Sequence, residues 1–166
     1  MGNGDTVVQH FDRHSWGELA LLPENRRGLV IALSAVTGLG LSALIGIASA
    51  RGSVPDPVAT HFGPNGATGY DSLTSTAAWA AVLTIVVGGL VTAAGFAIPG
   101  RRAARRLVAG LGVGAAAVIA GIFVAMVWSQ SGLADAAWAD FGFNQVWPSI
   151  FAGIIVAGFA STLVKE

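Results

Sequence analysis

The chain has 166 residues, of which 54% are hydrophobic and 11% are charged, and its formal net charge is zero. A soluble domain carries about 25% charged residues, so this composition excludes an ordinary soluble fold and predicts an integral membrane protein. The balanced charge gives no electrostatic basis for nucleic-acid binding. The sequence contains no cysteine, which excludes disulfides, thiolate catalysis and cysteine-ligated metals.

Residues 1–27 form a tail of mixed polarity ahead of the first apolar stretch. Its apolar side chains fall roughly on one side of a helix, at Val8, Phe11, Trp16, Leu19 and Leu22. That pattern is typical of a helix that lies in the membrane interface. A disordered tail is the alternative, because several glycines weaken the helical pattern.

Four long stretches without a charged residue follow the tail, at about 28–50, 73–98, 107–128 and 146–164. At about 1.5 Å rise per residue, each stretch is long enough to cross a hydrocarbon core of about 30 Å. The connections between them are short. The sequence therefore predicts an all-α membrane protein in which residues 28–166 form a single bundle of four transmembrane helices.

Basic residues are placed unevenly around these spans. If the chain crosses the membrane four times, eight of the nine lie on one side and only Arg51 lies on the other. The residues that set the topology are Arg26, Arg27, Arg101, Arg102, Arg105 and Arg106. The positive-inside rule then predicts that both termini lie inside, in the cytoplasm, and that two loops lie outside. A specific anionic-lipid site at the arginine cluster is a less favoured alternative.

Small residues recur at every fourth position of the spans. The first span carries the most regular series, Ser34, Gly38, Ser42 and Gly46. This spacing places them on one stripe, where small side chains let helix backbones approach closely. We favour packing of such stripes inside the bundle. The alternative is that the stripe of the first span docks onto another membrane protein.

The loop after the first span has a proline and glycine density that excludes a regular helix. Pro64-Asn65-Gly66 predicts a tight turn, with a short strand-like piece at Thr60-His61-Phe62 before it. Asp71 or Ser72 is expected to cap the second span. We therefore expect an ordered loop.

The loop contains Pro-x-Pro-Val-x-x-His-Phe-Gly-x-x-Gly directly after the first span. This pattern resembles the small bacterial membrane module called domain of unknown function 1648, which also occurs at the N-terminal end of SdpI-type immunity proteins. The resemblance covers roughly residues 30–95, and the matching positions are Pro55, Val58, His61, Phe62 and Gly66. Ala59 and Thr68-Gly69 depart from the family, which often has proline and Pro-Asp there. The resemblance implies a membrane module with an immunity-like or regulatory role.

The candidate site is the motif of this loop, made of Pro55, Asp56, Pro57, Val58, His61, Phe62, Gly66, Tyr70 and Asp71. His61 lies near two aspartates in sequence, but the spacing lacks the paired histidines of common metal sites. We favour a structural His61 that packs beside Phe62 and bonds loop carbonyls, over a partner contact and over a metal or catalytic role. No catalytic, cofactor or metal residue is assigned.

The second outward loop, residues 129–145, is rich in aromatic residues. Together with the adjoining span ends it supplies Trp128, Trp138, Phe141, Phe143 and Trp147. An interfacial aromatic belt is the favoured interpretation. The alternative is that these rings and the His61 loop form one outward platform for a peptide or protein.

The sequence thus favours a non-enzymatic membrane protein that binds or senses a partner at its outer face. An accessory subunit packed on a larger membrane complex is the alternative. A small transporter is less favoured, because the spans carry no ionisable residue. Beyond the lipid bilayer, the partners we expect are a peptide, a membrane protein or a second copy of the chain.

Overall fold

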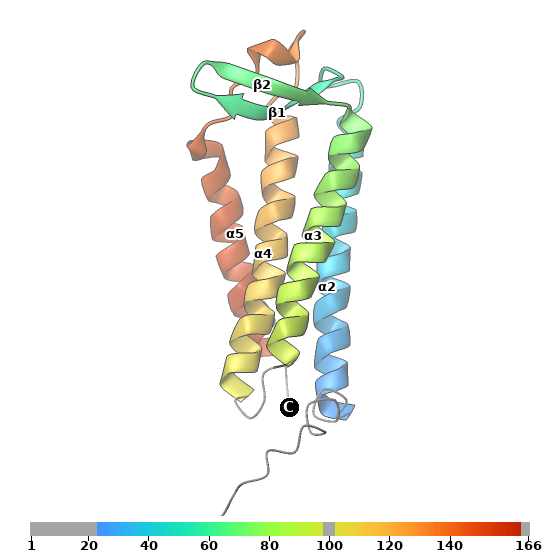
Figure 1. The fold of residues 1–166 in the computed structure, drawn as a ribbon, viewed down its shortest axis with the longest axis vertical. Helices are drawn as coiled ribbons and strands as arrows, with labels where there is room; N and C mark the ends of the chain where they lie inside the picture. The colour runs from blue at the N-terminus through green and yellow to red at the C-terminus, as the bar shows by residue number, and fades with distance from the viewer. Residues whose placement is uncertain (1–22, 98–101, 164–166) are drawn as a thin grey trace, which may run out of the picture.

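The computed structural model describes residues 23–97 and 102–163. The interfacial helix predicted for the N-terminal tail, and Arg101, lie outside these described residues. Four long helices run alternately up and down (Figure 1): α2 (Pro23–Ala48), α3 (Leu73–Phe96), α4 (Arg102–Trp128) and α5 (Phe143–Leu163). Each is long and apolar enough to cross a membrane, which confirms that the four predicted stretches form long apolar helices.

The all-α prediction needs one correction. Between α2 and α3 the chain forms an antiparallel hairpin of β1 (Val58–Gly63) and β2 (Gly66–Asp71). The connection between α4 and α5 adds a single 3₁₀ turn, η1 (Ala136–Trp138). The hairpin and η1 lie together across one end of the bundle (Figure 1), which we call the hairpin end.

Two helices begin earlier than the charge-free stretches predict. α2 begins at Pro23. Proline suits the first helical position because its φ is fixed near the helical value and because the N–H that it lacks would have no partner there. α4 begins at Arg102, so most of the arginine cluster is helical and not loop. Arginine is a good helix former, and a charged first turn extends a span beyond the hydrocarbon core at little cost.

The helices do not contribute equally to the bundle. α4 contacts all three others, α2 and α3 pack on each other, and α5 packs mainly on α4. Small residues make these contacts, as predicted for the later spans. On α3 the buried series is Ala80, Thr84, Gly88 and Thr92. A Cβ added to Gly114 of α4 would lie 2.7 Å from the carbonyl oxygen of Gly153 in α5.

α2 packs through a different stripe from the one predicted. Its buried residues include Ala32, Val36, Ala43 and Ile47, whereas Ser34, Gly38 and Ser42 are exposed and Gly46 is half-buried. A Cβ added to Gly38 would meet no atom within 4 Å. The buried stripe combines Val36 and Ile47 with small residues, among them Gly40, where an added Cβ would lie 2.6 Å from Ile85.

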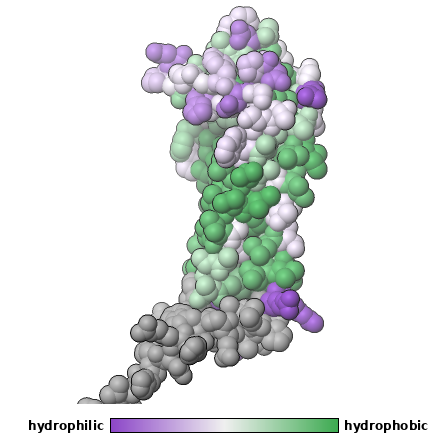
Figure 2. Space-filling view, turned by 45° about the vertical axis from the view of Figure 1, so that its right-hand side comes forward, coloured by the Kyte–Doolittle hydropathy of each residue, from purple (hydrophilic) through white to green (hydrophobic). Residues whose placement is uncertain are grey.

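The two ends of the molecule differ in charge. Figure 2 shows an apolar band along the side of the bundle below a more polar hairpin end. Residues 49–72 and 129–142 at that end carry four aspartates and one arginine. At the opposite end α2 and α4 begin and α5 ends (Figure 1). This end carries five arginines: Arg26, Arg27 and Arg102 are exposed, and Arg105 and Arg106 are half-buried.

Candidate functional site

The hairpin has a two-residue turn, Pro64-Asn65, between the paired residues Gly63 and Gly66. Gly66 has a φ of 106°, a value that side-chain-bearing residues rarely adopt. The tight turn predicted at these positions is therefore confirmed. The predicted strand-like piece is also present as part of β1, while its partner β2 was not foreseen.

Two polar side chains on either side of the hairpin bond backbone N–H groups at the start of α3. The Ser72 hydroxyl accepts a hydrogen bond from the Ser75 N–H at 3.1 Å, and the Asp56 carboxylate accepts one from the Leu73 N–H at 3.0 Å. These bonds satisfy donors that have no partner within the helix. Of the two predicted caps, Ser72 is confirmed. Asp71 instead accepts a hydrogen bond from the Thr60 hydroxyl at 3.1 Å.

A buried glutamine joins the second loop to the hairpin. Gln130, which is fully buried, accepts a hydrogen bond from the Ala59 N–H at 2.8 Å and donates one to the Ala59 carbonyl at 2.9 Å. Its amide also donates to the Met126 carbonyl at 3.0 Å. The side chain thus pairs with β1 as a neighbouring strand would. Sequence reasoning missed Gln130, whose only signal is an amide directly after an apolar span.

Apolar contacts complete the junction between the two loops. The Phe62 and Phe141 rings lie with centroids 5.7 Å apart. Beside them Ala59, Ala136 and Ala139 form a small buried cluster. Phe141 therefore belongs to this junction and not to an aromatic belt, whereas Trp138 remains exposed. The two loops form one joined surface, which we call the hairpin-end surface.

His61 is the one residue of β1 that is exposed. Its ring is exposed, its Nδ1 lies 3.2 Å from the Thr60 hydroxyl, and a Cβ added to Gly69 would lie 2.8 Å from that nitrogen. The hydrogen bond of the ring goes to the Thr60 hydroxyl and not to a loop carbonyl as predicted, and the pairing of β1 with β2 is irregular on both sides of His61. Packing of the ring beside Phe62 stays a prediction. Within the described residues, no three histidine, aspartate or glutamate side chains are grouped to hold a metal.

We expect His61→Ala to change the free energy of unfolding by no more than about 0.5 kcal/mol, as for most exposed substitutions. The reason is that His61 makes one exposed hydrogen bond and fills no buried space. Detergent unfolding followed by tryptophan fluorescence measures this change. A much larger loss would show that the ring supports the hairpin.

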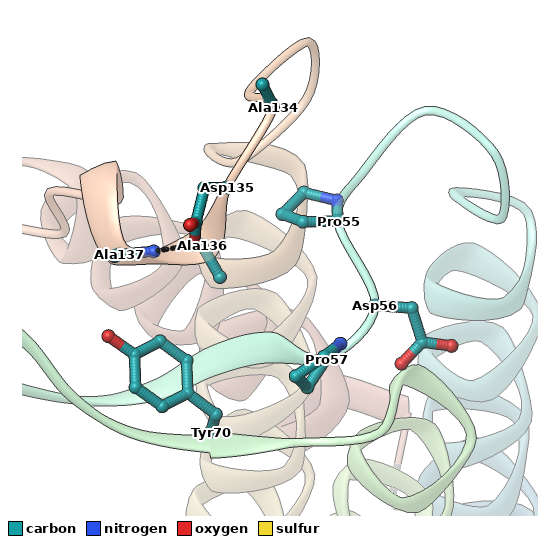
Figure 3. Close-up of a pocket in the computed structure, with 8 residues that line it drawn as sticks. All are labelled: Pro55, Asp56, Pro57, Tyr70, Ala134, Asp135, Ala136 and Ala137. Carbon is teal, nitrogen blue, oxygen red and sulfur yellow. Dashed lines mark hydrogen bonds between the residues drawn. The ribbon is translucent and has the colours of Figure 1, made fainter.

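An open pocket of about 480 Å³ lies between the two loops (Figure 3). Pro55, Asp56, Pro57 and Tyr70 line one side, and residues 134–137 line the other. Tyr70 and Asp56 lie on opposite sides of Pro57 (Figure 3). Each of the two lining carboxylates uses one oxygen as a backbone cap, Asp56 for Leu73 and Asp135 for Ala137.

The predicted motif thus divides into separate parts. Pro55, Asp56, Pro57 and Tyr70 line one side of the pocket. Val58 is fully buried beneath the hairpin and Phe62 packs against the same core. His61 and Asp71 flank Thr60 on the exposed side, away from the pocket lining.

No family model, curated protein or solved structure matches this chain.

Proposed function

We propose that this protein is a non-enzymatic membrane protein that binds a peptide or protein partner at the hairpin-end surface. An immunity-like or regulatory role fits such binding. The observation that supports it most is the junction of the two loops through Gln130 and Phe62. A connector that only links spans does not need a fully buried amide to hold it in one shape.

A preformed surface favours binding because less conformational freedom is lost when the partner docks. The pocket offers proline and alanine walls, one exposed tyrosine ring and two aspartates, the mixture of apolar surface and few polar groups that is typical of binding sites. The pocket lining also includes Pro55, one of the positions that match the 1648 module.

The distribution of charge supports an outward position for this surface. Arg26, Arg27, Arg102, Arg105 and Arg106 lie at the opposite end, so the positive-inside rule favours that end as cytoplasmic. The bacterial inner membrane, with both termini inside, is the location we propose. The joined loops would then face a partner outside the cytoplasm.

Site-specific photocrosslinking in native membranes tests this function. A photoreactive amino acid at Ala137, an exposed residue in the pocket lining, is expected to capture a discrete partner. The same amino acid at Ile155 is a matched control, since that side chain is 72% exposed on the apolar side of α5. Adducts equal in identity and yield at both positions would contradict binding at the hairpin-end surface.

An accessory subunit is the second candidate, and one observation favours it. Ser34, Gly38 and Ser42 form an exposed stripe of small residues on α2, and a Cβ added to Gly38 would meet no atom within 4 Å. Such stripes let another helix approach closely. A photoreactive residue at Gly38 has open space and tests this docking. Capture of a membrane protein at Gly38, without capture at Ala137, would replace the first proposal by the second.

A further inference from the structure

A second cavity lies beside the bundle, between the last turn of α2 and the first turns of α3. It has a volume of about 370 Å³ and is separate from the pocket on the hairpin-end surface. Because α2 and α3 are both long and apolar enough to span a membrane, their adjoining ends lie where the hydrocarbon core gives way to lipid headgroups. We call this cavity the α2–α3 groove.

The groove is polar at one end and apolar along its length. Arg51 and Thr74 lie at its hairpin end, and both side chains are exposed. Leu44 and Ala78 line the groove further from the hairpin end. Leu44 lies about one helical turn (about 5.4 Å) from Ala48 along α2, and Ala78 lies the same distance from Thr74 along α3. A phospholipid has the same order of groups, with a charged phosphate above apolar chains.

Arg51 is an exception to the charge pattern of this end. It is the only arginine or lysine in residues 49–72 and 129–142, beside four aspartates. Among the described residues, no carboxylate pairs with its guanidinium. Arginine binds phosphate through parallel hydrogen bonds, and these charge-assisted bonds are stronger than neutral ones. An anion from outside the chain is therefore the partner that fits it.

We propose that the α2–α3 groove binds one phospholipid, with its phosphate on Arg51 and the Thr74 hydroxyl and one acyl chain along Leu44 and Ala78. The apolar length of the groove selects a lipid over a free phosphate ion, which would leave that length uncovered. The site does not depend on which side of the membrane the hairpin end faces. It also does not depend on the proposed partner binding.

Native mass spectrometry of the full chain, titrated in mild detergent with phosphatidylglycerol, tests the site. The wild-type protein is expected to bind one lipid at least about tenfold more tightly than Arg51→Gln, the equivalent of about 1.4 kcal/mol. Arg26→Gln is the matched control, because it removes one exposed arginine from the end of α2 that lies away from Arg51. It is expected to bind like the wild type.

A second variant tests the groove without changing charge. Ala78→Phe adds a ring at an exposed lining position and is expected to weaken lipid binding by a similar factor while the protein stays folded. Millimolar inorganic phosphate is expected to leave the lipid bound. Equal lipid binding by wild type, Arg51→Gln and Ala78→Phe would overturn the proposal. Displacement of the lipid by inorganic phosphate would also overturn it, in favour of a free-anion site.

Discussion

Gln130→Leu is expected to lower the free energy of unfolding by about 3 kcal/mol, because it leaves two buried backbone groups without partners. Those groups are the N–H and the carbonyl of Ala59, a residue that is itself fully buried. Leucine fills a similar volume but offers neither a donor nor an acceptor. Equilibrium unfolding in mixed detergent micelles, followed by the five tryptophans of the chain, measures the loss.

Gln145→Leu is the matched control for this change. Its amide accepts a hydrogen bond from the Gly142 N–H at 2.7 Å, but the contact is exposed and water can replace it. We expect a loss of no more than about 1 kcal/mol, the net value of an ordinary hydrogen bond. Equal effects of the two substitutions would show that the buried amide does not hold the loops together.

Gly112→Ala is expected to destabilise the bundle by about 3 kcal/mol, near the upper end of the cost of overpacking. A Cβ at Gly112 of α4 would lie 2.5 Å from the backbone nitrogen of Thr92 and 2.9 Å from the carbonyl oxygen of Gly88, both in α3. These are backbone atoms that cannot rotate away, so the two helices would have to separate. The same unfolding measurement, supported by loss of helix signal in circular dichroism, reports the effect.

Gly38→Ala provides the comparison for the bundle. It makes the same chemical change on α2, where an added Cβ would meet nothing within 4 Å. Alanine also favours a helix by up to about 1 kcal/mol over glycine, so unchanged or slightly higher stability is expected. If Gly38→Ala destabilised the protein as much as Gly112→Ala, the close approach of α3 to Gly112 could not be the cause of the loss.

Several elements could be predicted from the sequence because their causes are local. Charge-free length defined the four spans, and the Pro64-Asn65-Gly66 turn and the Ser72 cap follow from backbone preferences of single residues. β2 was missed because Gly66-Ala67-Thr68-Gly69 has weak strand propensity by itself. It forms through pairing with β1, which is a tertiary effect.

The candidate site could be predicted only in part for the same reason. The loop motif located Pro55, Pro57 and Tyr70, but nothing in the local sequence shows that residues 134–137 complete the pocket. Gln130 lies 71 positions from Ala59, so no spacing rule links them. The packing face of α2 was also assigned to the wrong stripe, since a periodic series of small residues does not reveal which side a neighbour covers.

The proposed function depends on an accessible hairpin end that faces outward. The chain contains no cysteine, so single cysteines can be placed without background. Asn65→Cys lies in the exposed turn of the hairpin, and Ala103→Cys is exposed at the start of α4, at the opposite end.

Labelling of these two variants in intact cells with a membrane-impermeant maleimide is the most direct test. Our account predicts that Asn65→Cys is labelled in intact cells and that Ala103→Cys is labelled only after the membrane is opened. The reverse pattern would place the hairpin-end surface in the cytoplasm and contradict the account.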